Sequence, residues 1–311
     1  MRPVTDPEAP LLDATLALVA AHPASRGIVQ TVHHPTYDRR LAERVCQLTR
    51  QICEERGVSY ASAVADFIAG CAEFVKHQRR LERTGTYAAS SFEATRRAVY
   101  DNPQVMETTY LHTLVLSQAL WLNHVRILDA FRRGFCAEVP PAGRVLEVPV
   151  GCGLYLAEFA RHNPAWHAVG IDLSASAIEF SRRLVRLAGA AHVELQQRDV
   201  FALEAARPYD RVICGELLEH LEAPEALLGK LHDLLAPDGR LFLTTAIWAA
   251  NPDHIYLFES ADEVRHMIGE WFTLVDEWVL PLEADASPEQ RRVAINYACV
   301  LRHRDVMPSR P

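Results

Sequence analysis

The residues best suited to chemistry lie in one stretch, Arg144-Val-Leu-Glu-Val-Pro-Val-Gly-Cys-Gly153, and in the Val169-Gly-Ile-Asp172 that follows it. The apolar run before the glycines is typical of a strand buried in a parallel sheet. Glycine lets the backbone approach a ligand that side chains would exclude. Asp172 follows Gly153 by roughly 20 residues, the spacing at which a carboxylate ending the second strand meets ribose hydroxyls. The pattern predicts a strand, a tight turn, a helix and a second strand that together bind a nucleotide.

The same turn indicates which nucleotide cofactor binds. Dinucleotide enzymes use G-x-G-x-x-G, in which the third glycine lets the helix pack closely on the strand. Leu156 occupies that third position here, and Glu147 precedes the turn, where a carboxylate repels phosphates. A nicotinamide-dependent dehydrogenase is therefore disfavoured, and a ligand with a cationic amine is favoured.

The turn resembles the first motif of class I S-adenosylmethionine-dependent methyltransferases, acidic-x-G-x-G-x-G. Glu147, Gly151 and Gly153 match it, and Pro149 stands in place of the first glycine. The resemblance implies S-adenosylmethionine as the cofactor. The cofactor contacts that it implies are Glu147, Pro149, Gly151, Gly153, Asp172, Leu173, Asp199, Val200, Gly215 and Glu216.

Further stretches continue the resemblance in the family's order, over about residues 140–303. Residues 193–201 read as a third strand ending in an acid, 209–221 as a fourth strand with its loop, and 236–245 as a glycine turn with a fifth strand. A helical stretch then precedes two strand-like runs, 272–282 and 292–301. The expected fold is α/β: a Rossmann-like seven-stranded class I methyltransferase sheet with an antiparallel last strand, plus an all-helical N-terminal cap.

Two domains are expected, a helical cap over residues 1–138 and a catalytic domain over 139–311. Apolar residues of the first part recur at three- and four-residue steps, as in the stripe of an amphipathic helix. Asn102-Pro103 is a favourable helix start, and residues 104–133 predict one long, nearly continuous helix.

Added N-terminal helices in class I enzymes that act on small molecules often close over the sheet's carboxyl edge, where ligands bind. Tyr110, Trp121, Asn123 and, beyond the fourth strand, Tyr256 are therefore our candidate substrate contacts, although Tyr110 and Trp121 also suit a helical core.

The loop after the fourth strand carries E-x-x-E-H, formed by Glu216, Glu219 and His220, and His254 follows later. The motif is similar to one that holds a divalent cation in ubiquinone-biosynthesis O-methyltransferases and small-RNA 2′-O-methyltransferases. Such short strings also occur without metal, so we predict none. His220 and His254 are then our candidate catalytic bases, because the ordinary histidine pKa suits proton removal near neutrality.

Composition limits the partners of this 311-residue chain. A net charge of −8 without a basic block argues against a nucleic-acid substrate. Seven cysteines without a C-x-x-C pair indicate neither a disulfide framework nor a thiolate zinc site. No apolar run reaches the roughly 18 residues of a membrane span, and no signal-peptide pattern begins the chain. We expect a cytoplasmic protein with no membrane partner and leave its oligomeric state open.

These observations lead to an enzyme that methylates a small-molecule acceptor, such as a secondary metabolite. One alternative is a cyclase resembling azetidine-2-carboxylate synthases, which release methylthioadenosine when the cofactor's own amine attacks its γ-carbon. Glu147 opposes that alternative if it pairs with the amine, because a carboxylate stabilises the unreactive ammonium. A second alternative is a cofactor-binding protein without turnover.

Overall fold

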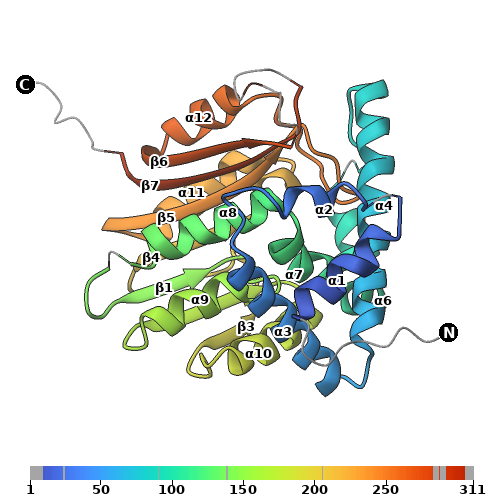
Figure 1. Ribbon diagram of the computed structural model, residues 1–311. Helices are drawn as coiled ribbons and strands as arrows, with labels where there is room; N and C mark the ends of the chain where they lie inside the picture. The colour runs from blue at the N-terminus through green and yellow to red at the C-terminus, as the bar shows by residue number, and fades with distance from the viewer. Residues whose placement is uncertain are drawn as a thin grey trace, which may run out of the picture.

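The computed structural model describes residues 10–304 except 24, 90, 138, 205, 283–286 and 288–291. The outer ends of both predicted domains, residues 1–9 and 305–311, lie outside the described residues. One seven-stranded sheet forms the centre of the molecule (Figure 1). Its strands are β1 (Arg144–Glu147), β2 (His167–Asp172), β3 (Glu194–Gln197), β4 (Tyr209–Gly215), β5 (Leu235–Ile247), β6 (Phe272–Pro281) and β7 (Ile295–His303).

The strand order is β3-β2-β1-β4-β5-β7-β6. Strands β1 to β5 pair in parallel, and β7 runs antiparallel to both β5 and β6. The predicted class I methyltransferase fold, with its antiparallel last strand, is confirmed. The carboxyl ends of β1, β2, β4 and β5 meet at one edge, which is where ligands of open α/β sheets bind.

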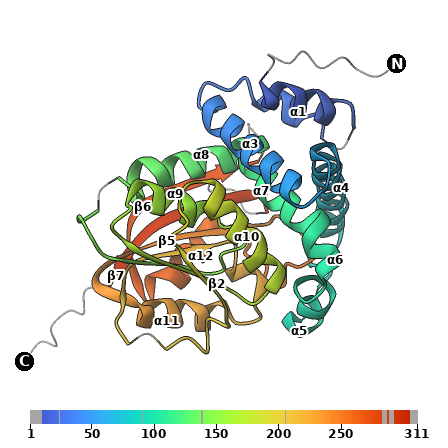
Figure 2. The same ribbon diagram turned by 90° about the horizontal axis from the view of Figure 1, so that it is seen from below.

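Helices cover both faces of the sheet, as Figure 2 shows for α8, α9 and α10 on one side and α11 on the other. Side chains alternate along each strand, so Val145 packs with the first helix layer while Leu146 packs with the second. The helices and turns that follow β1 are α9 (Leu154–His162), α10 (Ala175–Leu187), η4 (Leu218–His220), α11 (Pro224–Leu234) and α12 (Ala261–Gly269).

The part of the chain before β1 is helical, as predicted. Its elements are α1 (Leu11–Ala20), α2 (Ile28–Thr31), α3 (Arg39–Glu55), α4 (Tyr60–Thr84), α5 (Phe92–Thr95), η1 (Arg96–Tyr100), α6 (Pro103–Val105), η2 (Met106–Tyr110), α7 (Leu111–Leu120), α8 (Leu122–Ala130) and η3 (Phe131–Phe135). Asn102 caps α6 by accepting hydrogen bonds from the Gln104 and Val105 amides, which confirms the predicted helix start. Phe131 packs edge-on against Phe242 of β5, so the helical part is in direct contact with the sheet. The division at residue 138 stays a prediction.

The prediction of one continuous helix over residues 104–133 is wrong. Residues 106–110 form a π-helical turn, and Trp121 has an extended backbone (φ −93°, ψ 119°) that separates α7 from α8. The Trp121 ring packs against Phe67, Phe74 and His124, with ring centroids 6.1, 5.9 and 4.9 Å away. These long-range contacts determine the break, because apolar residues recur with helical spacing on both sides of it.

No single helix among the described residues is long and apolar enough to cross a membrane. Helices α3 and α4, which meet at a bend of 117°, pass the same test of length and composition only as a pair. All seven cysteines are buried and free, in agreement with the expectation that they form no disulfide framework.

Candidate active site

A cavity of about 1700 Å³ lies at the carboxyl edge of the sheet, between the strand ends and the N-terminal helices. Sites for single drug-sized ligands measure about 300–1,000 Å³, so this cavity has room for a cofactor and a second molecule. Nearly all of the predicted cofactor contacts line it. They are Glu147, Pro149, Gly151, Asp172, Leu173, Asp199, Val200, Gly215 and Glu216.

The two glycines of the first turn have different roles. Gly151 borders the cavity with φ +51°, and a Cβ there would lie 3.0 Å from Leu114 of α7. Gly153 does not line the cavity. Its φ is +80°, and a Cβ there would lie 2.9 Å from the Ser181 Cβ of α10. Gly153 therefore allows helix packing rather than ligand approach, while the cis peptide bond before Pro149 completes the turn.

Two acidic side chains connect this turn to its neighbours. Glu147 is buried, its Oε2 accepts a hydrogen bond from the Leu156 amide at 3.0 Å, and burial raises its pKa well above the ordinary range. Asp172 accepts hydrogen bonds from the amides of Gly151 at 3.0 Å and Ser174 at 2.9 Å. Burial raises the pKa of Asp172 to about 6. Both carboxyl groups face a cavity in which a cation or a hydroxyl donor would stabilise their ionised forms.

Glu216 follows β4 in a conformation that few side chains adopt. Its φ is +48°, in the left-handed region, which costs a non-glycine residue roughly 1–2 kcal/mol. The Glu216 amide donates hydrogen bonds to the carbonyl oxygen and the hydroxyl of Thr244, at 3.0 and 3.1 Å. Such local strain concentrates at functional sites. Here it accompanies a carboxylate on the cavity wall.

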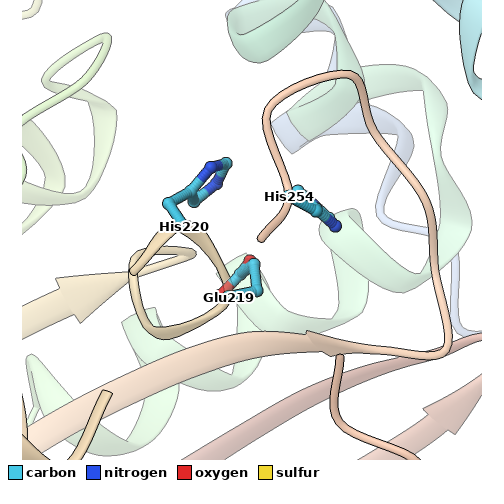
Figure 3. A group of neighbouring side chains, drawn as sticks. All are labelled: Glu219, His220 and His254. Atoms are coloured by element: carbon cyan, nitrogen blue, oxygen red, sulfur yellow. The ribbon is translucent and has the colours of Figure 1, made fainter. Parts of the chain in front are cut away.

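Glu219, His220 and His254 form a cluster between the loops that follow β4 and β5 (Figure 3). One potential ligand atom from each lies within 4.8 Å of the others. Glu219 is fully buried, and its Oε2 accepts a hydrogen bond from the Thr245 hydroxyl at 2.7 Å. Its Oε1 has no hydrogen-bond partner among the described residues. Burial, together with the nearby Glu216 carboxyl, raises the pKa of Glu219 well above its ordinary range.

The two histidines present similar nitrogens to this cluster. His254 Nδ1 lies 2.7 Å from the Ala249 carbonyl and must donate to it, so the lone pair is on Nε2, which lies 3.4 Å from Asn251 Nδ2. Burial lowers the pKa of His254 to about 3, so its ring is neutral near pH 7. His220 Nδ1 lies 3.1 Å from the Asp253 carbonyl, which assigns its proton to Nδ1 and its lone pair to Nε2.

This donor set fits a divalent cation. Metal-bound histidines usually donate their second ring N–H to a carbonyl or a carboxylate, as both histidines do here. The unpartnered, buried Glu219 Oε1 supplies the anionic ligand that such a site requires. The absence of metal predicted from the sequence remains untested, and the geometry favours the alternative that the motif offered.

Three of the four predicted substrate contacts, Tyr110, Trp121 and Asn123, line the cavity. Asn123 also has a structural role, because its Nδ2 donates to the carbonyl oxygens of Leu280 and Pro281 at 2.9 and 3.1 Å. Tyr256 is not among the lining residues, and its hydroxyl donates to Glu263 at 3.2 Å.

Several polar residues at the cavity were not predicted from the sequence. They are Tyr100, Gln118, Tyr155, Asp253 and Asn296. Asp253 had one available signal, its place directly before His254. The others lie in stretches whose composition is ordinary for a helix or a strand, so only the fold brings them to the site.

Comparison with known proteins agrees with this geometry. Residues 146–241 match the family model described as a methyltransferase domain. The ubiquinone biosynthesis O-methyltransferase of Xylella fastidiosa is 36% identical over 127 residues, which cover 40% of this chain and 48% of that protein. The enzyme of the same name from Neisseria meningitidis serogroup A is 34% identical over 143 residues, 45% of this chain and 59% of that protein. The chain thus spans about half the length of the curated relatives it matches.

Among solved structures, coclaurine N-methyltransferase bound to N-methylheliamine and SAH superposes with a TM-score of 0.53 and 17% identity. The superposition covers 84% of this chain and 95% of that one, so the shared fold extends beyond the matched segment. Together with the strand order and the first turn, these matches confirm the resemblance: residues 146–241 match a methyltransferase domain, and the chain has the class I methyltransferase fold.

Proposed function

We propose that this protein transfers the methyl group of S-adenosylmethionine to a hydroxyl oxygen of a small, largely apolar molecule. The observation that carries the proposal is one continuous cavity with two unlike ends. The cofactor residues surround one end, and the Glu219 cluster lies beside it. Apolar side chains from α4, α7 and α8, including Phe74, Leu114 and Leu122, line the remainder together with Trp121 between α7 and α8. A secondary metabolite is an acceptor of this kind, and a cytoplasmic location suits free, buried cysteines.

The residues around the first turn bind and orient the cofactor. S-adenosylmethionine supplies a methyl group already activated by its sulfonium. Glu147 would hold the cofactor's ammonium group, and this pairing would lower the raised pKa of the buried Glu147 carboxyl. Asp172 would accept hydrogen bonds from the ribose hydroxyls. Holding two reactants in line contributes about 7–11 kcal/mol in well-oriented model reactions, so the site requires no protein nucleophile.

The Glu219 cluster prepares the acceptor oxygen. Glu219, His220 and His254 would hold a divalent cation, which would polarise a hydroxyl group and lower its pKa. His254 is a poor general base near neutrality, because its pKa is lowered to about 3. We therefore replace its predicted role as a base by that of a neutral ligand. The cavity's volume beyond one cofactor argues against the cyclase alternative, which needs no second substrate.

The test is product analysis of the purified protein with S-adenosylmethionine and a panel of hydroxylated aromatic and alicyclic molecules of increasing size, with matched amines. We expect adenosylhomocysteine and a methyl ether to form only with hydroxylated acceptors. Methylthioadenosine above the no-enzyme control with S-adenosylmethionine alone would show a cyclase. Methylation of amines alone would overturn the choice of oxygen, and tight cofactor binding without any product would support the alternative without turnover.

A further inference from the structure

Two π-helical turns of the N-terminal part end at tyrosines that meet over the Glu219 cluster. The turns η1 and η2 have five residues each and end at Tyr100 and Tyr110. The two rings lie edge to face, with centroids 5.9 Å apart. π-Turns are rare and occur frequently at functional sites, because the wider turn redirects the side chains that follow. Two such turns within fifteen residues deliver two hydroxyl groups to one place.

That place is the carboxylate of Asp253, which is buried directly before His254. The Tyr100 hydroxyl donates to Asp253 Oδ2 at 3.0 Å, and the Tyr110 phenol lies close enough to Asp253 to interact with it electrostatically. The hydrogen bond from Tyr100 fixes the orientation of this carboxylate. A buried carboxylate held in this way either supports a neighbouring group or serves only local packing.

The contacts of His220 identify the supported group. Its Nδ1 lies 3.0 Å from the Tyr100 hydroxyl oxygen, 3.1 Å from the Asp253 carbonyl oxygen and 3.5 Å from Asp253 Oδ2. The first two oxygens accept from the same N–H and fix the ring, while the Asp253 carboxylate lies beside them, so Nε2 keeps its lone pair for a ligand. The ligand face of His220 is therefore set by the N-terminal helices as well as by its own loop.

Tyr100 also reaches the cofactor side of the cavity. Its carbonyl oxygen accepts a hydrogen bond from the Ser174 hydroxyl at 2.9 Å. Ser174 caps α10 and follows Asp172 by two positions. Tyr100 thus contacts the loops that follow β2, β4 and β5. Both Tyr100 and Tyr110 line the cavity.

We propose that Tyr100 and Tyr110 are positioning residues of the cation site, so that cation binding and the docking of residues 96–110 across the cavity stabilise each other. This inference rests on the cation proposed above at Glu219, His220 and His254. Linkage is reciprocal: if the docked segment improves cation affinity, the bound cation must hold the segment more tightly by the same free energy. The helical part is then a component of the site rather than only a cover over it.

The experiment combines two readouts on the full chain, free of metal and of cofactor. Manganese(II) affinity is measured from the electron paramagnetic resonance signal of the free ion, with zinc(II) calorimetry as a second probe. Hydrogen exchange of residues 96–110 is followed by mass spectrometry with and without manganese. The variants are Tyr100→Phe, the double variant Tyr100→Phe/Tyr110→Phe, and Asp253→Asn. The control is Tyr60→Phe, which removes a tyrosine hydroxyl bonded to Thr15 in the same helical part.

We expect the wild-type chain and Tyr60→Phe to bind one manganese ion and to show slower exchange over residues 96–110 when it binds. The double variant and Asp253→Asn should bind about 10- to 100-fold more weakly, the usual effect of losing outer-shell partners, and the double variant should lose the manganese-dependent protection. Should Asp253→Asn fail to fold, the tyrosine variants carry the test.

Two results would overturn the inference, and they differ in meaning. Wild-type affinity in the double variant, with exchange of residues 96–110 indifferent to manganese, would leave the cation site intact and remove the role of the tyrosines. No binding of manganese or zinc to the wild-type chain would remove the cation site itself. The second result would also remove the cation's proposed role in preparing the acceptor, whereas cofactor binding and methyl transfer are measured separately and can hold without it.

Discussion

Two buried glutamates of this protein, Glu158 and Glu219, have very different surroundings. Glu158 of α9 is 1% exposed and forms ion pairs with Arg44, Arg132 and Arg161. Glu219 is 0% exposed and forms no ion pair among the described residues, and one of its oxygens has no partner. Burying an unpaired carboxylate is costly, so pairing is the expected structural solution, and Glu158 follows it. Glu219 departs from it beside a cavity, and this departure is the reason we propose a functional role for Glu219.

Enzyme activity should show the functional difference between the two glutamates most strongly. Glu219→Gln keeps the size of the side chain and the bond to Thr245 but removes the anionic ligand. We expect adenosylhomocysteine formation with the best acceptor to fall by about 100-fold or more, while the Kd for S-adenosylmethionine is unchanged. Turnover numbers and calorimetric titration with the cofactor provide the measurement. Activity within a few-fold of wild type would place Glu219 outside the chemistry.

Stability should respond in the opposite order. Glu158→Gln leaves three neighbouring guanidinium groups without their shared anion. Breaking a buried ion pair costs about 3–5 kcal/mol, and we expect about 2 kcal/mol here because the arginine side chains are 25–36% exposed. Glu219→Gln should change the free energy of unfolding by less than about 1 kcal/mol. Urea unfolding of both variants, free of metal, decides the order, and a larger loss for Glu219→Gln would reverse the comparison.

The cofactor end of the cavity offers a pH test. Burial raises the pKa of Asp172 to about 6, and an ionised carboxylate accepts hydrogen bonds from ribose hydroxyls more strongly than a protonated one. The Kd for S-adenosylmethionine should therefore fall about 5-fold as the pH rises through 6, which corresponds to roughly 1 kcal/mol. Asp172→Asn should bind weakly at every pH and lack this step. An equal pH step in wild type and variant would assign the titration to another group.

A second pH test concerns His124, a buried histidine on the cavity wall. Burial lowers its pKa to about 4, below the value of 6.5 for an unfolded chain. The folded state thus excludes a proton that the unfolded state binds, so stability is complete above pH 6.5 and declines as the pH falls toward 4. The decline is at most about 1.4 kcal/mol per pH unit. Thermal unfolding of His124→Gln across this range should show a shallower decline, and an unchanged slope would contradict the assignment.

The first turn was predictable because its geometry depends on neighbours in sequence. One unit of strand, turn, helix and second strand contains Glu147, Gly151 and Asp172. The spacing of a sequence motif indicates such a unit directly. The later strands were predictable from the resemblance, because the stretches that follow the first turn occur in the family's order. Gly153 shows a limit of this reasoning, because its lack of a side chain serves packing against Ser181 rather than the ligand.

The acceptor end was less predictable because it is assembled from distant segments. Tyr100, Asp253 and His220 meet only after the helical part docks on the sheet. Trp121 breaks a stretch whose periodicity continues through it. The Tyr256 hydroxyl donates to Glu263, although His254, two residues before it, lines the cavity. Hydrophobic periodicity indicates whether a residue is buried but not which distant residue it contacts. The roles of these positions could therefore be seen only in the folded structure.

The most direct test of the account is a crystal structure of the protein grown with adenosylhomocysteine and manganese(II), with anomalous data collected at the manganese edge. The account predicts one anomalous peak enclosed by Glu219 Oε1, His220 Nε2 and His254 Nε2, beside a cofactor that contacts Glu147 and Asp172. A fully occupied cofactor with no anomalous peak among these three side chains would contradict it.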